Sequence, residues 1–444
     1  MRGRLLSDEQ FRRLAVDELA AAEAGTPAGV KATASRHPNG PDVLGPREFQ
    51  SKGVDCYRLT LPQAGIRFEV DRLRRERHEL IGELAVYCAL PGAKTVNGAL
   101  SIGNLNLSST RARQERAKFL AQRARTKDID WVGLVEEFAQ RVLAAEREGG
   151  AAADLRTLPA PGPENNLEVE GLVLPRRHPT IFFGDGGAAK SYLALWLAGR
   201  LAELGVSVGL FDWELAAEDH RDRLERLFPE GMPRVIYARC ERPLTYEADR
   251  LLRIVREHKI EYAVFDSIGF ACDGPPEAAE VAGAYFRAVR RLGVGSLHVA
   301  HIAKAEGGDK KPFGSVFWHN GARATWFVKL DDSSPDGSVL TIGLFPRKNN
   351  LRKLQEPLGF QVIFEEYETI FRPADVADSP DLSATLTVRQ RMIAALKRGA
   401  ASFEELAEEI DASVETVKRT ARRYKKLFVV LDGGRVGLAE RRAE

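Results

Sequence analysis

One stretch, residues 180–192, limits what this chain can fold into more than any other, and its sequence is TIFFGDGGAAKSY. Three apolar residues at 181–183 predict a buried strand, and the apolar residues at 193–201 predict a helix. A glycine-rich turn followed by Lys-Ser, between a strand and a helix, is the pattern of a phosphate-binding loop. Small residues let backbone N–H groups converge on phosphate oxygens, and the lysine adds a full positive charge.

The expected nucleotide site is a run of nine residues, and we predict that it holds ATP and Mg²⁺. Its members are Gly184, Asp185, Gly186, Gly187, Ala188, Ala189, Lys190, Ser191 and Tyr192. The three glycines are expected to provide positive φ angles and close backbone approach, and the serine hydroxyl to ligate Mg²⁺. Ala189 departs from the pattern, which has glycine before the lysine, but alanine is the smallest change possible. The alternative is a glycine turn followed by Lys-Ser by chance.

Length and composition describe an ordinary globular protein of two to four domains, with 444 residues, 44% hydrophobic and 29% charged. No apolar run is long enough to span a membrane, so we expect a cytoplasmic protein without a membrane partner. The four cysteines lie far apart, which favours reduced thiols over a metal site. The net charge of only +2 means that any nucleic-acid surface must be a local patch.

We divide the chain into three regions joined by linkers at residues 151–166 and 371–384. Residues 1–150 are expected to be basic and mainly helical, with helices over 7–24, 71–90, 108–127 and 129–147, a connector over 25–48 and two strands within 57–70. Two of these helices are rich in arginine and could engage DNA or aid assembly. The alternative is that their charged faces contact only solvent.

Residues 167–370 alternate strands with helices after the glycine loop, which predicts a mostly parallel sheet. Glu214, Asp266 and His301 each follow a predicted strand, so they should meet at the carboxyl edge of the sheet, beside the loop. Asp266 suits a magnesium-holding aspartate and Glu214 a base for water, with Asp212 as a competitor. His301 could sense the γ-phosphate. The alternatives are a turn aspartate, a surface glutamate and a structural histidine.

Seven motifs of this region together resemble the RepA-like hexameric replicative helicases, which belong to the RecA/DnaB group of motor ATPases. They are GDGGAAKS at 184–191, FDWE at 211–214, VFDS at 264–267, HIAK at 301–304, FGS at 313–315, ARATW at 322–326 and RKN at 347–349. The resemblance covers roughly residues 167–370, less than half of the chain. It implies a RecA-like P-loop core.

The resemblance also assigns roles. Lys190 and Ser191 would bind phosphates and Mg²⁺, Glu214 would be the general base, Asp266 would hold Mg²⁺ through water, and His301 would be the γ-phosphate sensor. Arg323 would be an arginine finger acting on the neighbouring subunit, which requires a homo-oligomeric ring, expected to be a hexamer. Arg347 and Lys348 would lie near the same interface. A loop carrying Lys304, Lys310 and Lys311 would face single-stranded DNA in the ring channel, unless it is only a surface loop.

The last region, residues 385–444, has the element order of a winged helix-turn-helix domain. We expect helices over 387–397, from Ser402 and from Ser413, then a hairpin over 428–438. Duplex DNA would be contacted by basic residues of the third helix and the wing, namely Lys418, Arg419, Arg422, Arg423 and Arg435. The alternative is a protein-docking module.

These patterns favour an ATP-dependent DNA motor, a ring-forming RepA-like replicative helicase of a plasmid, phage or integrated element. Two other hypotheses remain open. One is a RecA-like recombination or repair ATPase that does not unwind DNA. The other is an ATP-gated DNA-binding regulator that acts through the winged helix.

Overall fold

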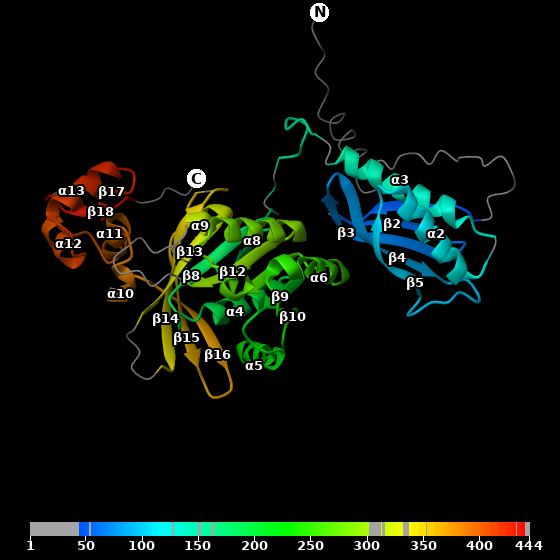
Figure 1. The fold of residues 1–444 in the computed structure, drawn as a ribbon. Helices are drawn as coiled ribbons and strands as arrows, with labels where there is room; N and C mark the ends of the chain where they lie inside the picture. Colours follow the sequence, from blue (N-terminus) through cyan, green and yellow to red (C-terminus); the bar gives the residue numbers. More distant parts are fainter. Residues whose placement is uncertain are drawn as a thin grey trace, which may run out of the picture. The chain divides into compact units, whose positions relative to one another are not determined.

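The computed structural model describes residues 44–52, 55–126, 128–149, 152–160, 162, 165–301, 312, 316–331, 337–351, 353–431 and 433–439. The chain divides into two compact units, Met1–Gly149 and Gly150–Glu444 (Figure 1). The helix predicted over residues 7–24, and most of the connector after it, lie outside the described residues. In the described part of the chain, no helix is both long and apolar enough to cross a membrane.

The first unit is a five-stranded antiparallel sheet with two helices against one face (Figure 1). In sheet order its strands are β1 (Glu48–Ser51), β2 (Tyr57–Leu61), β3 (Ile66–Glu76), β4 (Glu79–Cys88) and β5 (Ala99–Asn106). The helices are α2 (Thr110–Ala124) and α3 (Trp131–Glu148). Alternate residues of β2 to β4 are buried, and their side chains pack on an aromatic cluster that includes Phe68, Trp131 and Phe138.

The predicted helix over residues 71–90 is wrong, and so is the mainly helical character expected for residues 1–150. The segment forms the β3–β4 hairpin, which turns at Arg77 and His78 with φ angles of 46° and 73°. The turn lacks the usual glycine or asparagine, which hid the hairpin. Period-two burial on β4 was the available signal, because the apolar residues at 80, 84, 86 and 88 share one face. Gly82 agrees, since a Cβ there would lie 2.6 Å from the Val70 side chain on β3.

The second unit is built on a nine-stranded sheet in the order β10-β9-β11-β12-β8-β13-β14-β15-β16. Six strands run parallel: β8 (Pro179–Gly184), β9 (Val208–Asp212), β10 (Val235–Arg239), β11 (Tyr262–Asp266), β12 (Gly295–His301) and β13 (Ala324–Asp331). The other three are antiparallel to their neighbours: β14 (Val339–Asn349), β15 (Leu358–Phe364) and β16 (Thr369–Ala374). The predicted mostly parallel sheet is therefore confirmed.

Helices cover both faces of this sheet and form one core on each face. Successive side chains of β8 point alternately into the two cores. Phe182 lies in the core under α4 (Lys190–Glu203) and α5 (Ala217–Leu227). Ile181 and Phe183 lie in the opposite core, under α6 (Leu244–Glu257), α8 (Ala279–Leu292) and α9 (Val316–Gly321) (Figure 1). The remaining elements are the short helix α7 (Ile268–Ala271) and a hairpin of β6 (Asn166–Val169) and β7 (Leu172–Pro175).

The linker predicted over residues 371–384 is wrong. Strand β16 continues to Ala374, and the short helix α10 (Pro380–Ser383) follows it. Val376 and Leu382 are buried in the core beneath α6 and α8. These two apolar side chains hold the segment in place, because each buries its apolar surface against a core that is already formed.

The end of the chain contains three short helices and a two-stranded hairpin. They are α11 (Val388–Leu396), α12 (Phe403–Glu409), α13 (Val414–Arg423), β17 (Phe428–Val430) and β18 (Val436–Leu438). The helix starts predicted at Ser402 and Ser413 are confirmed, since each serine side chain accepts a hydrogen bond from a backbone N–H of its first turn. The core of this part is centred on Met392, Leu406 and Val417.

Candidate nucleotide site

The glycine loop joins the end of β8 to the start of α4. Gly184 is required by close approach, because a Cβ there would lie 2.0 Å from the carbonyl oxygen of Val328 on β13. Gly187 has a φ of 78°. Gly186 contradicts the prediction, since its φ is not positive and a Cβ there would meet no atom within 4 Å. Ala189 has a left-handed φ of 50°, and no side chain caps the helix that follows it. The first N–H groups of α4 are thus left for an anion.

Lys190 is the first residue of α4 and is only 4% exposed. Its Nζ donates a hydrogen bond to the Asp185 carbonyl oxygen at 2.6 Å, so it is folded back onto the loop. Burial lowers the pKa of the ammonium to about 8, although the carboxylates of Asp266, Asp185 and Glu214 oppose the shift. An anionic ligand at the loop would add further favourable charge and offset the loss of water around the lysine.

Asp266 ends β11 and is 2% exposed. Burial raises the pKa of its carboxyl to about 6, against a hydrogen bond from Ser191 that lowers it. Its Oδ1 is buried without a hydrogen-bond partner among the described residues. A hydroxyl, a buried carboxylate with an unsatisfied oxygen and a nearby phosphate site are a donor set that suits Mg²⁺, which takes few protein oxygens and completes its shell with substrate and water. Ser191 and Asp266 therefore fit the predicted cation.

The structure separates the two competing carboxylates at the end of β9. Asp212 is fully buried, and its Oδ2 accepts hydrogen bonds from the Leu215 N–H at 2.7 Å and from Arg239 at 3.2 Å. Glu214 is exposed, accepts a hydrogen bond from the Ser267 hydroxyl, and raises the pKa of Lys190 by its charge. Only Glu214 can meet a water molecule at the loop. Its partner Ser267 was not predicted from the sequence, because the contact joins residues far apart in the chain.

His301 is the last residue of β12 and pairs in register with Gly184 on β8. It is half-buried, and its pKa is lowered by burial and by the charge of Lys190, while Glu214 opposes the shift. The lowered pKa favours the neutral imidazole, in which one nitrogen is a donor and the other an acceptor. The structure thus brings Lys190, Glu214, Asp266 and His301 together at the carboxyl ends of the parallel strands, and their roles stay predictions.

Arg323 lies at the opposite end of the parallel strands, where β8 and β13 begin. Its N–H donates to the Pro179 carbonyl oxygen at 2.9 Å, at the start of β8, whereas the glycine loop follows the end of that strand. The length of β8 therefore separates Arg323 from its own loop by roughly 17 Å, at about 3.3 Å per residue. Arg347 is exposed, with its guanidinium over the Phe327 ring at 5.4 Å.

Lys348 is engaged within its own chain. Its Nζ donates to the carbonyl oxygens of His319, Asn320 and Ala322 at 2.7, 3.2 and 2.9 Å. These carbonyls end α9 and lead into Arg323, so Lys348 fixes the base of that arginine. The position of Lys348 near a subunit interface stays a prediction. The Tyr192 ring packs edge-on against Phe364 with Arg223 over its face, and its contact with a nucleotide likewise stays a prediction.

The predicted DNA contacts differ in how exposed they are. Lys304, Lys310 and Lys311 lie outside the described residues, as do residues 313–315 of the family motif. On α13, Arg419, Arg422 and Arg423 are exposed, whereas Lys418 is paired with Glu404 at 3.6 Å. Arg435 donates a hydrogen bond to the Ala400 carbonyl oxygen, which links the β17–β18 hairpin to the segment before α12.

Many solved structures are similar to part of this chain, and two of them serve as examples. The ATPase domain of G40P matches with a TM-score of 0.37 and 11% identity, over 45% of this chain and 85% of that one. The KaiC-like protein PH0186 from the hyperthermophilic archaeon Pyrococcus horikoshii OT3 matches with a TM-score of 0.35 and 17% identity, over 45% and 91%. No protein-family model and no curated protein matched. Similarities this weak do not bear on what the chain does.

The first prediction concerns Ala189. Because its φ is left-handed, Ala189→Gly removes steric strain, and we expect it to stabilise the second unit by about 0.5–1 kcal/mol. Thermal and urea unfolding followed by tryptophan fluorescence would measure this. Ala202→Gly in the same helix is the control, and it should destabilise by a similar amount. An Ala189→Gly protein less stable than the wild type would contradict the strain argument.

The second prediction concerns pH. The pKa of free Lys190 is lowered to about 8, and a bound phosphate needs the ammonium, so binding takes up a proton above that pH. Nucleotide affinity should be nearly level between about pH 7 and 8, above the pKa of about 6 of the Asp266 carboxyl, and fall about tenfold between pH 8 and 9.5. Titrating a fluorescent ATP analogue against pH would measure it. Lys190→Arg should flatten this alkaline decline, and an equally steep decline in that variant would assign the proton to another group.

The third prediction separates Glu214 from Asp212. Glu214→Gln should keep nucleotide affinity and lower kcat by about 100-fold or more, because an amide cannot accept the proton of water. Asp212→Asn should instead lower the free energy of unfolding by about 2 kcal/mol. The amide oxygen can still accept from Leu215 and Arg239, but the buried negative charge that faces Arg239 is lost, and an NH₂ group takes the place of Oδ1, 3.4 Å from His220 Nε2. Turnover per folded molecule should then stay near that of the wild type. The reverse pattern would make Asp212 the base.

Proposed function

We propose that this chain is a Mg·ATP-dependent DNA motor, a ring-forming RepA-like replicative helicase of a plasmid, phage or integrated element. One observation carries the proposal. The glycine loop, Asp266, Glu214 and His301 lie at one sheet edge, while Arg323 lies at the other, beyond reach of its own loop. A site complete except for a distant arginine is what a subunit-interface ATPase requires.

In this mechanism each residue of the edge has one task. Loop N–H groups and Lys190 hold the phosphates, and Lys190 must release the Asp185 carbonyl to do so. Ser191 and Asp266 would hold Mg²⁺, which supplies positive charge to the phosphate oxygens when bound. Glu214, oriented by Ser267, would accept a proton from the attacking water. Neutral His301 would donate a hydrogen bond toward the γ-phosphate.

Arg323 of a neighbouring subunit would complete the site by stabilising charge that develops on the transferred phosphoryl group. The Lys348 contacts support this assignment, because they hold the segment before Arg323 in place. Single-stranded DNA would pass through the ring channel, where Lys304, Lys310 and Lys311 are the candidate contacts. Residues 385–444 would be a winged helix-turn-helix domain that binds duplex DNA through Arg419, Arg422 and Arg423.

Two alternatives predict different behaviour. A recombination or repair ATPase of the RecA type would be stimulated by single strands without separating a fork. An ATP-gated regulator would bind a specific duplex through the exposed arginines of α13 and turn over ATP slowly, regardless of single strands.

The fourth prediction is the test of the motor. ATP hydrolysis by the wild type should rise severalfold or more with single-stranded DNA, and a forked duplex should be unwound. Lys190→Ala and Arg323→Ala should each lose turnover by about 1,000-fold, because one loses the phosphate charge and the other the finger. Wild-type turnover that ignores DNA would contradict the motor and favour the regulator.

Mixing the two inactive variants tests whether Arg323 acts in trans. The loop of an Arg323→Ala subunit is intact, and so is the arginine of a Lys190→Ala subunit. In random rings made from equal amounts, about a quarter of the interfaces would pair an intact loop with an intact finger. Activity should therefore reappear on mixing. Turnover that stays absent, in rings shown to have exchanged subunits, would count against the trans assignment.

A further inference from the structure

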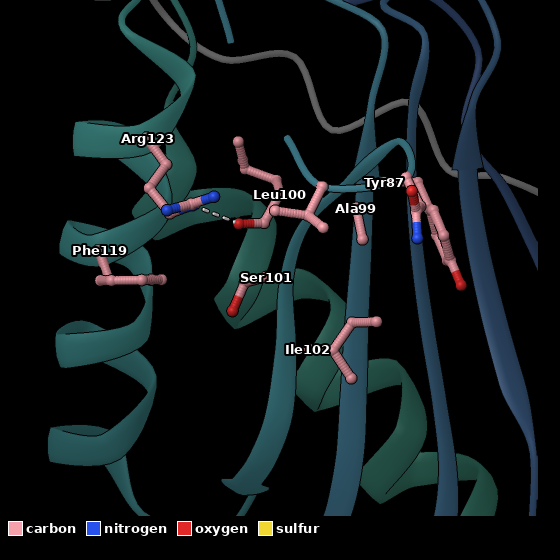
Figure 2. A pocket seen from close by; sticks show the side chains of 9 residues that line it. Tyr87, Ala99, Leu100, Ser101, Ile102, Phe119 and Arg123 are labelled. Atoms are coloured by element: carbon pink, nitrogen blue, oxygen red, sulfur yellow. Dashed lines mark hydrogen bonds between the residues drawn. The ribbon is translucent and has the colours of Figure 1, made fainter. Parts of the chain in front are cut away.

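A hollow of about 430 Å³ lies in the first unit, at the edge of its sheet, and the proposed ATPase cycle does not use it. Strand β5 is the last strand of the sheet, and α2 runs beside it. Figure 2 shows Phe119 and Arg123 of α2 facing the β5 residues Ser101 and Ile102, with Tyr87 of β4 on the far side. We name this feature the β5–α2 groove.

The groove exposes apolar side chains that a folded domain would normally cover. Val96 is 66% exposed, Ile102 59% and Phe119 46%. Their apolar surface is contiguous because all three line the same hollow. An exposed cluster of this kind gains free energy when a ligand covers it, so it marks a binding surface.

The charge around the groove is strongly positive. Residues 84–126 contain seven lysines and arginines and a single acidic residue, Glu115, which pairs with Arg111. The other basic residues, apart from the buried Arg113, lie on the surface, and Lys94 and Lys118 are exposed. The whole chain is nearly neutral at +2, so this is a local patch. An anionic ligand is therefore favoured.

Two arginines of α2 hydrogen-bond to the outer edge of β5, where another strand would otherwise pair. Arg123 Nε donates to the Leu100 carbonyl oxygen at 2.6 Å, and Arg116 Nη2 donates to that of Asn104 at 2.8 Å. These carbonyls would otherwise be acceptors for an added peptide strand. Their occupation argues against an extended peptide as the ligand.

Aromatic rings and guanidinium groups alternate along the groove. Arg116, Phe119 and Arg123 are spaced by three and four residues, which places them on one face of α2. The Arg123 guanidinium lies 5.7 Å from the Phe119 ring centre, and that of Arg67 lies 4.2 Å from the Tyr87 ring centre. A single-stranded nucleic acid offers the matching alternation of phosphates and flat apolar bases. A duplex stacks its bases inside and would leave the rings uncovered.

We propose that the β5–α2 groove binds single-stranded nucleic acid, with a base against Phe119 and phosphates near Lys94, Lys118 and the two arginines. The proposal deepens the motor function, because it gives the strand a second contact outside the ATPase unit. It rests on the proposed function in one respect only, which is that the bound strand is DNA.

The fifth prediction is a change in strand affinity, measured on the full chain without nucleotide by anisotropy of a labelled oligo-dT of about 20 nucleotides. Phe119→Ala should weaken binding by about 5-fold to 50-fold through the loss of one stacking contact. Lys94→Gln with Lys118→Gln should lower the slope of log affinity against log salt by about 1.4. Tyr246→Ala, at a 56% exposed aromatic residue of α6, and Lys353→Gln, at an exposed lysine, are matched controls that should change nothing.

The outcomes separate this proposal from the motor itself. Phe119→Ala that binds the strand as tightly as the wild type would overturn the groove proposal. If that variant also shifts the sedimentation of the assembly, the groove is a contact between copies of the chain instead. Weakened binding in Phe119→Ala, in a protein whose turnover ignores DNA, would support the groove while the motor fails. If single strands stimulate the wild-type ATPase but Phe119→Ala binds the strand as tightly as the wild type, the motor is supported and the groove proposal fails.

Discussion

The candidate site depends on the burial of strand β8 on both of its faces. All six of its residues are buried, and Ile181, Phe182 and Phe183 point alternately into the two helical layers. Each such side chain contributes about 1.5–3 kcal/mol on burial, so the strand cannot shift by one residue without exchanging its faces. Its register with β12 in turn sets Gly184 opposite His301. The position of the loop is therefore set by the packing of β8 together with its backbone pairing to β12 and β13.

The same burial creates the electrostatics of the loop. Lys190 and Asp266 both lose water there, so the pKa of the lysine falls to about 8 and that of the carboxyl rises to about 6. Their own attraction does not offset the loss, and an oxygen of Asp266 has no hydrogen-bond partner in the described structure. Mg²⁺ and phosphate would supply the missing partners together. The buried ammonium of Lys190 and carboxylate of Asp266 are thus incompletely satisfied, and a nucleotide with its metal would bind to both.

The sequence predicts the second unit far better than the first. The loop and the strands at 181–183 and 262–265 are continuous apolar runs next to glycine or aspartate, and a two-sided parallel sheet accounts for them. Residues 71–90 are misleading because four arginines and scattered leucines imitate a helical face, while the turn at Arg77 and His78 carries no glycine. Asp212 and Glu214 are two residues apart, so only packing could show that one is buried and the other exposed. Contacts between distant residues, such as Ser267 with Glu214 and Lys348 with α9, leave no local pattern.

The separation of the two sheet edges limits how hydrolysis could be coupled to movement. His301 and Arg323 lie 22 positions apart in sequence, from 301 to 323, and at opposite edges. The Arg323 end is anchored, because Trp318 is fully buried against Tyr285 and Phe286, and Lys348 holds the three carbonyls after it. Displacing Trp318 would open a cavity costing several kcal/mol, roughly 3–5 by analogy with truncated aromatics. In the proposed ring, Arg323 would therefore move with its whole subunit, and it would engage or leave a neighbouring loop by rigid-body rotation between subunits rather than by a local loop change.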